Sequence, residues 1–321
     1  VSQAEAGAQI LDVNVGAPMV DEALLLPELV QRLTGKYAEP LSLDSSHAEA
    51  IAAALPFCPG SPLVNSISGE ADRMEHLGPL CRQWGAPFIL LPIQGRKLPV
   101  KAADRIAIIE NMLDKAAILG IPRRLVLVDV LALAVASKAE AAREGLETIR
   151  WCAAHGLATT IGLSNISFGL PQRTLVTQAF LTQAIQSGLT LPIINPNQKD
   201  MMDAVDACRV LSGEDVHCAA YIERHAAQIK PQTGVQTGAK LSIEEAIAKG
   251  LRDESAAAAR ELLAVMPPLD VVEQKLIPAL DAVGEQYEKQ IIFLPQLMNA
   301  AAASGAAFDE VRRVIERSGA A

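Results

Sequence analysis

Seven short apolar runs, each followed by a longer segment, dominate the first two-thirds of this 321-residue chain. The runs are almost continuously apolar, as strands buried on both faces of a parallel sheet must be. They cover residues 9–16, 40–46, 62–69, 87–94, 124–133, 159–167 and 191–198. Helical patterns lie between them, for example at residues 104–119 and 139–155, the second ending before Gly156. This alternation predicts an α/β fold built on a parallel sheet.

Seven strand–helix units are one short of the eight that form a (β/α)8 barrel. Residues 2–7 are typical of the end of a helix, so we expect the missing first strand to precede Val1. No Gly-x-Gly-x-x-Gly sequence follows any of the predicted strands, which favours a TIM barrel over an open doubly wound sheet. The open sheet is the alternative.

The character of the sequence changes after residue 225. Residues 226–240 are polar and rich in Gly, Gln and Thr, as a linker is. Ser242 and Glu245 then form an S-x-x-E capping box, and no strand pattern follows. Helical patterns cover residues 243–251, 254–266, 269–286, 294–303 and 308–317. We therefore predict a barrel at 1–225, a linker at 226–240 and an all-α helical bundle at 241–321 that packs independently of the barrel.

Charge and composition exclude several classes of protein. A net charge of −9 with only 3% aromatic residues argues against nucleic-acid binding. No apolar run approaches the ~20 residues of a membrane span, and no signal peptide opens the chain. Five cysteines without a Cys-x-x-Cys pair indicate buried thiols in a reducing, cytoplasmic environment. A metal site at Cys208, His217 and Cys218 is the less favoured interpretation.

Polar side chains occur where the predicted strands end. The carboxyl ends of parallel strands meet at one edge of a sheet, where α/β barrels keep their chemistry. A carboxylate can accept two parallel hydrogen bonds from the N–H and NH2 edge of a guanine or pterin ring, and Asn can both donate and accept. A single Asp is usually a helix cap, and a single Asn such as Asn165 can simply satisfy loop backbone. The whole set points to one shared heterocyclic ligand: Asp12, Asn14, Asp44, Asn65, Asp129, Asn165 and Asn195.

Five segments at these strand ends carry a family resemblance. They are DVNVG at 12–16, DSS at 44–46, VNSISGE at 64–70, VDVL at 128–131 and GLSNISFGLPQR at 162–173. They resemble the pterin-binding barrels, which include cobalamin-dependent methionine synthase, methyltetrahydrofolate–corrinoid protein methyltransferases and dihydropteroate synthase. The long last motif is similar to the methyltransferase branch. The resemblance covers residues 1–225 and implies a chain truncated at both ends.

The resemblance implies roles for individual residues. Asp44, Asn65 and Asp129 would hold the pterin of 5-methyltetrahydrofolate, and Asn165 would be the catalytic residue beside N5, favouring positive charge as the methyl group leaves. The other residues implied in pterin binding are Asp12, Asn14 and Arg173. The nucleophile would be the Co(I) of cobalamin, with no metal held by this chain. One departure is Val130 after Asp129, where the family usually has Pro.

Two further segments, PALDAVGEQY at 278–287 and IFLPQLM at 292–298, resemble the helical cap of a cobalamin-binding module. The resemblance implies that Tyr287, Leu294 and Met298 cover one face of the cobalamin. A Rossmann-like corrinoid domain or protein would hold the other face as a partner. Its Asp-x-His-x-x-Gly motif does not occur in this sequence. The competing interpretation is that the three side chains belong to the core of the bundle.

The leading hypothesis is a methyltransferase that moves the N5 methyl of 5-methyltetrahydrofolate to Co(I) cobalamin, as in methionine synthesis from homocysteine. One alternative is a dihydropteroate synthase-like enzyme, although residues 191–198 lack the basic Ser-x-Arg segment expected there. Another is a non-catalytic, truncated pterin- or corrinoid-binding module. The sequence leaves open the final methyl acceptor, the oligomeric state, and activity without a first strand and a corrinoid domain.

Overall fold

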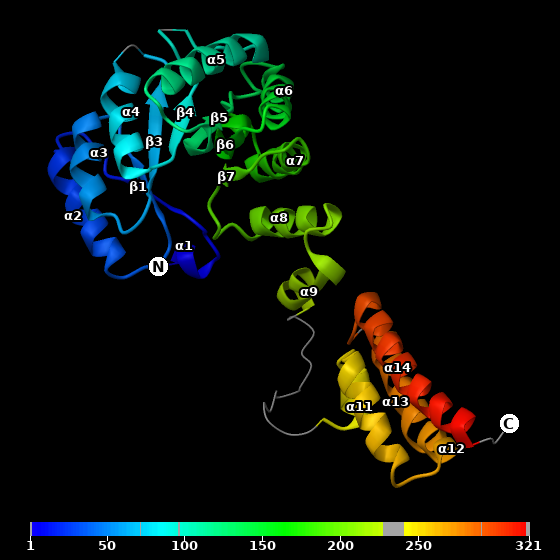
Figure 1. Ribbon diagram of the computed structural model, residues 1–321. Coiled ribbons are helices and arrows are strands. Elements are labelled where there is room, and N and C mark those ends of the chain that lie inside the picture. The colour runs from blue at the N-terminus through cyan, green and yellow to red at the C-terminus, as the bar shows by residue number, and fades with distance from the viewer. Residues whose placement is uncertain (1, 71, 96, 227–240, 290, 319–321) are drawn as a thin grey trace. The chain divides into compact units, whose positions relative to one another are not determined.

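The computed structural model describes residues 2–70, 72–95, 97–226, 241–289 and 291–318. The chain divides into two compact units, Val1–Ser212 and Gly213–Ala321 (Figure 1). Apart from Ala226, the predicted linker lies outside the described residues. The division at 1–225, 226–240 and 241–321, with the independence of the bundle, therefore stays a prediction.

The first unit is built on one seven-stranded sheet in the order β1-β2-β3-β4-β5-β6-β7, with every neighbouring pair parallel. Each strand overlaps one of the predicted apolar runs. The bounds are β1 (Leu11–Asn14), β2 (Leu41–Asp44), β3 (Leu63–Ser68), β4 (Phe88–Leu91), β5 (Val126–Asp129), β6 (Ala158–Gly162) and β7 (Leu191–Ile193). The sheet curls, and its strands follow sequence order without the reversal of a doubly wound sheet (Figure 1). The predicted barrel type, one strand short, is confirmed.

Helices follow the strands and cover the outer face of the sheet (Figure 1). The core between the two layers contains fully buried strand residues such as Leu43, Val64 and Val128, and helix residues such as Leu26 and Ile109. Burial of these apolar side chains is what holds the helices on the sheet. The helices are α1 (Ser2–Glu5), α2 (Glu22–Thr34), α3 (Ala48–Ala54), η1 (Leu55–Phe57), α4 (Arg73–Trp84), α5 (Ala102–Ile118), η2 (Arg123–Leu125), α6 (Ala141–Ala154), η3 (Leu163–Ser167), α7 (Arg173–Gln186) and α8 (Lys199–Leu211).

Every predicted run is longer than the observed strand, and in two cases the chain beyond the strand takes a defined form. The run at 159–167 changes into the 3₁₀ helix η3 after Gly162, and the run at 191–198 leaves the sheet after Ile193. In the second case the Asn195 side chain accepts a hydrogen bond from the Asn197 backbone N–H at 3.1 Å. That local bond makes an Asx turn in place of a ladder bond. Both segments become loops at the carboxyl edge of the sheet.

The second unit contains no strand among its described residues. Its helices are η4 (Val216–Cys218), α9 (Ala219–Ala226), α10 (Ile243–Ala248), α11 (Arg252–Leu263), α12 (Pro268–Val271), the π-helical turn η5 (Val272–Leu276), α13 (Ile277–Glu288) and α14 (Leu294–Ser318). The predicted capping box opens α10, because Glu245 N donates to Ser242 Oγ and Ser242 N donates to Glu245 Oε2, both at 3.2 Å. The all-α region expected after the barrel is confirmed.

The predicted break between helices at 294–303 and 308–317 is wrong, because one helix, α14, spans both. Ser304 and Ala307 are buried, and α14 packs along α11. Tertiary packing of a helix face outweighs the ~1 kcal/mol that Gly305 costs within a helix. No helix of the described residues is long and apolar enough to cross a bilayer.

Candidate functional site

The pairing register aligns polar residues across the first three strands. Asn14 on β1 is paired with Asp44 on β2, and Asp44 is paired with Asn65 on β3. Paired residues of neighbouring parallel strands project from the same face of the sheet. Asp12 lies two residues before Asn14 and therefore shares that face. The register thus brings together four of the predicted residues on β1, β2 and β3, with Asn14 and Asp44 at the carboxyl ends of their strands.

These four side chains are joined by two amide–carboxylate hydrogen bonds. Asn14 Nδ2 donates to Asp44 Oδ2 at 2.9 Å, and Asn65 Nδ2 donates to Asp12 Oδ1 at 3.3 Å. The Asn14 Oδ1 atom also accepts from the Gly16 backbone N–H at 2.8 Å. Each amide therefore fixes the direction in which a neighbouring carboxylate presents its oxygens. Such an oriented set is suited to a ring with several N–H donors.

Burial raises the pKa of the Asp44 carboxyl above its ordinary value, and the nearby Asp12 and Glu22 raise it further. The hydrogen bond from Asn14 opposes this rise. Glu22 begins α2 and accepts a 2.5 Å hydrogen bond from Ser45 Oγ. The edge of the sheet around Asp44 is therefore acidic, and a donor-rich, uncharged or cationic group fits it better than an anion.

Arg73, which the sequence analysis missed, stabilises the loops beside Asp44 and Asn65. Its guanidinium donates to three backbone carbonyls: Ser45 O at 3.3 Å, Ser46 O at 2.5 Å and Ser66 O at 2.9 Å. One side chain from the first position of α4 thereby joins the β2–α3 loop to β3. The signal in the sequence is a basic residue just after the VNSISGE segment.

Asp129 is the last residue of β5, and its Oδ1 accepts a 2.8 Å hydrogen bond from the Leu131 backbone N–H. Burial raises the pKa of the Asp129 carboxyl to about 6, although that hydrogen bond and the charge of Arg105 oppose the rise. Arg105, a buried residue of α5, is a second arginine that the sequence analysis missed. A partly buried carboxyl of this kind can accept hydrogen bonds from a ring, and it changes its protonation state close to neutral pH.

Asn165 lies in η3, directly after β6, and its side chain is exposed. The backbone carbonyl of Asn165 accepts from Phe168 N at 3.1 Å, but its side-chain amide makes no hydrogen bond to any described residue. A Cβ atom at Gly162 would lie 3.5 Å from Asn165 Nδ2, an ordinary van der Waals contact. The side chain is thus available to a ligand at the carboxyl edge.

Arg173 begins α7 and is engaged with the loop that carries Asn165. Its Nη2 donates to Ser164 O at 2.5 Å, and its Nε donates to Ser167 Oγ at 3.2 Å. The guanidinium also lies over the Phe168 ring, 5.7 Å from its centroid. Arg173 therefore orders this loop, and its contact with a pterin stays a prediction.

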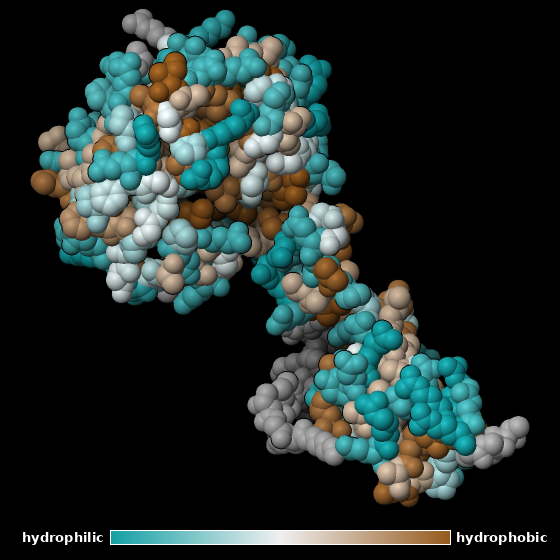
Figure 2. All heavy atoms as spheres, viewed as in Figure 1, coloured by the Kyte–Doolittle hydropathy of each residue, from teal (hydrophilic) through white to brown (hydrophobic). Residues whose placement is uncertain are grey.

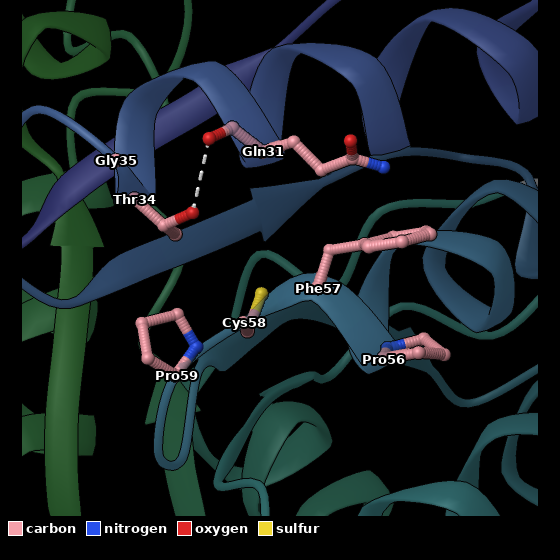
Figure 3. Close-up of a pocket in the computed structure, with 7 residues that line it drawn as sticks. All are labelled: Gln31, Thr34, Gly35, Pro56, Phe57, Cys58 and Pro59. Carbon is pink, nitrogen blue, oxygen red and sulfur yellow. Dashed lines mark hydrogen bonds between the residues drawn. The ribbon is translucent and has the colours of Figure 1, made fainter.

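A surface pocket elsewhere in the first unit contains none of the predicted residues. It is lined by Gln31, Thr34, Gly35 and residues 56–59, between the end of α2 and η1 (Figure 3). Because α2 runs from the carboxyl end of β1 back to the start of β2, this pocket lies at the amino edge of the sheet. Burial raises the pKa of the Cys58 thiol there to about 11, so the thiol is protonated at neutral pH.

Three apolar side chains are exposed on the second unit where α13 ends and α14 begins. The exposed fractions are 40% for Tyr287, 55% for Leu294 and 63% for Met298. Apolar side chains are visible on the surfaces of both units (Figure 2). The bundle core instead comprises residues such as Ile247 and Leu276. These three side chains therefore do not belong to the core, which was the competing interpretation.

The described residues contain no group of three His, Cys, Asp or Glu side chains that could hold a metal ion. Cys208, His217 and Cys218, the alternative metal site considered from the sequence, therefore do not form such a group. All five cysteines are free thiols.

Two family models match this sequence. The model described as a pterin binding enzyme matches residues 1–195, and the model described as a B12 binding domain matches residues 242–312. A methylcorrinoid:tetrahydrofolate methyltransferase from Eubacterium limosum is 30% identical over 229 residues, which is 69% of this chain and 83% of that relative. The methionine synthase of Mycobacterium tuberculosis is 25% identical over 347 residues, covering 98% of this chain and 29% of the relative.

Solved structures show the same fold in the first unit. Dihydropteroate synthase from Xanthomonas albilineans, in complex with 7,8-dihydropteroate, matches with a TM-score of 0.54 and 20% identity over 66% of this chain and 84% of that chain. The Yersinia pestis enzyme matches with a TM-score of 0.55 and 18% identity, over 66% of this chain and 86% of that chain. At these identities the likeness concerns the fold alone.

Proposed function

This chain belongs to the pterin-binding enzyme family, in the methyltransferase branch that joins such a barrel to a B12-binding domain, and on that premise we propose its reaction. The barrel binds 5-methyltetrahydrofolate and transfers its N5 methyl group to the Co(I) centre of cobalamin. The observation that carries the proposal is the aligned row of Asn14, Asp44 and Asn65, with Asn14 hydrogen-bonded to Asp44 and Asn65 to Asp12, in a chain that also matches a B12-binding domain.

Binding of the pterin rests on the two carboxylates that end β2 and β5. Asp44 and Asp129 are both partly buried, and a carboxylate in such a place gains when it accepts two parallel bonds from a ring N–H and NH2. Asn14 orients the Asp44 carboxylate and Asn65 orients that of Asp12, and both offer amide groups to the ring nitrogens and carbonyl. Asp12 completes this row, and Arg173 contributes by holding the Asn165 loop.

Catalysis rests on Asn165. Transfer of the methyl group from an unprotonated N5 would leave an amide anion, which is a poor leaving group, so N5 must be protonated and leave as a neutral amine. The side-chain carbonyl oxygen of Asn165 can accept a hydrogen bond from protonated N5 and so stabilise the charge where it develops. The Asn165 side chain is suited to this role because it is exposed and makes no hydrogen bond to another described residue. Bound cobalamin supplies the nucleophile, a strongly reducing Co(I) centre.

The surface of Tyr287, Leu294 and Met298 fits the apolar upper face of a corrin. All three are exposed apolar side chains near the junction of α13 and α14, and Met and Tyr adapt well to a flat, partly polar ring. We assign the lower face of the cobalamin to a Rossmann-like corrinoid domain or protein as the partner. The match to methionine synthases over 98% of this chain favours homocysteine as the final acceptor and a cytoplasmic role in methionine synthesis.

The chain spans 29% of the length of the methionine synthase of Mycobacterium tuberculosis, so that acceptor is part of the proposal. The name of the Eubacterium limosum relative describes transfer in the opposite direction, from a methylcorrinoid to tetrahydrofolate. The same residues would serve both directions, because forward and reverse reactions share one transition state. A dihydropteroate synthase-like activity has less support, since it gives no role to a B12-binding domain.

The proposal is tested by titrating the full chain with 5-methyltetrahydrofolate in a calorimeter and by following methyl transfer to added Co(I) cobalamin through its absorbance. Asp44→Ala should raise the Kd roughly ten- to 150-fold, the equivalent of losing a charge-assisted partner of about 1.5–3 kcal/mol. Asn165→Ala should change the Kd little and mainly slow transfer. The control is Asp114→Ala, an exposed carboxylate on α5.

Two outcomes would count against this assignment. Absence of folate binding by the wild-type chain would refute the proposed function itself. Equal increases in Kd for Asp44→Ala and Asn165→Ala, without an effect of Asn165→Ala on the rate, would refute the division of roles between binding and catalysis.

A further inference from the structure

Arg105 on α5 is the only fully buried arginine among the described residues, with an exposed fraction of 0%. Its guanidinium donates four hydrogen bonds, and every acceptor is a backbone carbonyl. The acceptors are Pro99 O at 3.0 Å, Val100 O at 3.2 Å, Val130 O at 2.7 Å and Leu131 O at 3.1 Å. The planar fork of arginine is suited to such an array, which a lysine could not reproduce.

The four carbonyls belong to the segments that follow two neighbouring strands. Pro99 and Val100 lie between β4 and α5, whereas Val130 and Leu131 follow Asp129 at the end of β5. Burying a guanidinium is costly, and replacing buried charges by apolar groups is often neutral or stabilising. Stability alone therefore gives no reason for a charged residue at this position, and its contacts all lead to the β4 and β5 loops.

The backbone of Leu131 connects Arg105 to Asp129 through one hydrogen bond on each side. The Leu131 N–H donates to Asp129 Oδ1 at 2.8 Å, while the Leu131 carbonyl accepts from Arg105 Nη1 at 3.1 Å. Leu131 has φ of 56°, a left-handed conformation that is strained for a residue with a side chain. The hydrogen bonds on its two sides hold this conformation, and with it the direction of the Asp129 carboxylate.

The charges around this link come from three elements. Arg105 on α5 lowers the pKa of Asp129 on β5, against the effect of burial. Glu144 on α6 faces Arg105 and is itself held by the Ala102 backbone N–H at 2.9 Å and by Lys101 Nζ at 3.3 Å. Both carboxylates therefore act on Arg105, Glu144 more strongly than Asp129, and the charge of Arg105 still lowers the pKa of Asp129.

We propose that Arg105 is a positioning residue for the pterin site, which fixes the Asp129 carboxylate against the folate by holding the backbone of Val130 and Leu131. The inference rests on the proposed function and deepens it, because it assigns part of folate affinity to a residue that does not touch the ligand. Two separable effects follow. The guanidinium fork sets the position of the carboxylate, and the charge keeps it ionised at lower pH.

The test compares three variants of the full chain: Arg105→Met, Arg105→Lys and the control Arg82→Met. Arg82 also donates to a backbone carbonyl, Leu119 O at 3.0 Å, but at the amino edge of the sheet. The Kd of 5-methyltetrahydrofolate is measured by calorimetry from pH 5 to pH 8, and tryptophan fluorescence checks that each variant is folded.

Arg105→Met should raise the Kd at least tenfold at pH 7.5 and move the pH midpoint of binding up by about 1 unit, because an opposing charge has been removed. Arg105→Lys should keep the wild-type midpoint while losing affinity, since it retains the charge without the fork. Arg82→Met should have the wild-type Kd and the wild-type pH midpoint of binding. A purely structural role for Arg105 would not move the midpoint.

A folded Arg105→Met variant with wild-type Kd and midpoint would overturn the inference. If that variant does not fold, Arg105→Lys decides: a wild-type Kd would overturn the inference, and a raised Kd in a variant that keeps the urea-unfolding midpoint of the wild type would support it. Failure of the wild-type chain to bind the folate would refute the proposed function, and this inference with it. If the wild-type chain binds the folate and the Arg105 variants have the same Kd and the same pH midpoint of binding, only this inference is refuted.

Discussion

The Asp129→Asn substitution should stabilise the barrel while removing folate binding. Burial raises the pKa of Asp129 to about 6 from the ordinary value of 3.8. Between these two pH values the folded protein retains a proton that the unfolded chain releases. The free energy of unfolding contributed by Asp129 therefore falls as pH rises through this window, and the loss is complete above pH 6. Asparagine has the same shape and no charge, so it avoids this loss.

The size of the effect follows from the shift of about 2 pKa units, at 1.36 kcal/mol per unit, which gives an upper bound of about 3 kcal/mol. Asp129 is not completely buried, and solvent screening reduces the figure to roughly 1–2 kcal/mol. With a urea slope of about 3 kcal/mol/M, the unfolding midpoint should rise by roughly 0.3–0.7 M at pH 8. Near pH 4 the wild type and the variant should coincide.

Tryptophan fluorescence during urea unfolding measures this effect in the barrel specifically, because both tryptophans of the chain, Trp84 and Trp151, lie in the first unit. Asp114→Asn, an exposed carboxylate on α5, is the matched control and should change the midpoint little at any pH. If the wild type and Asp129→Asn give parallel stability profiles from pH 4 to pH 8, burial of Asp129 does not perturb its titration and the reasoning is refuted.

Two further substitutions test local stabilising contacts. Glu144→Gln should destabilise the barrel at pH 7, because hydrogen bonds from the Ala102 backbone and Lys101 lower the pKa of Glu144. This stability is present above the unfolded pKa and lost as pH falls through the lower folded pKa, so the urea midpoints of wild type and variant should approach each other only below the ordinary pKa of 4.5. Ser242→Ala should lower the free energy of unfolding of the helical unit by about 1 kcal/mol, measured by thermal melting in far-UV circular dichroism, because Glu245 N loses its acceptor. An unchanged melt would show that the capping box contributes nothing.

The barrel and the location of its polar residues could be predicted because both follow from local sequence patterns. Continuous apolar runs identify parallel strands, and the residues that end them must lie at one edge of the sheet. The alternation of Asp12 and Asn14 even places both side chains on one face. The hydrogen bonds between Asn14 and Asp44, and between Asn65 and Asp12, could not be predicted. They depend on the register of separate strands, which no single run of sequence determines.

The extent of α14 illustrates a second limit. Ser304 and Gly305 are poor helix formers, and on local grounds a break between two helices was a reasonable prediction. The helix continues because Ala300, Ser304, Ala307 and Val311 are buried. These positions recur at intervals of three and four, so the pattern for one continuous helix was present in the sequence. The pattern was hard to recognise because three of these four residues are small and only weakly hydrophobic or polar.

Arg105 shows that a site residue can be missed although the sequence contains a signal for it. The buried residues of α5 are Ala102, Arg105, Ile109, Met112 and Ala116, spaced by three and four along one helix face. An arginine in the middle of an apolar stripe is unusual, because charged residues are almost never fully buried without partners. A search for charged residues that interrupt an apolar face would have selected Arg105. Its hydrogen-bond acceptors are four backbone carbonyls from two loops, and any residue type can supply a backbone carbonyl. The sequence therefore does not indicate these contacts, and only the structure connects Arg105 with Asp129.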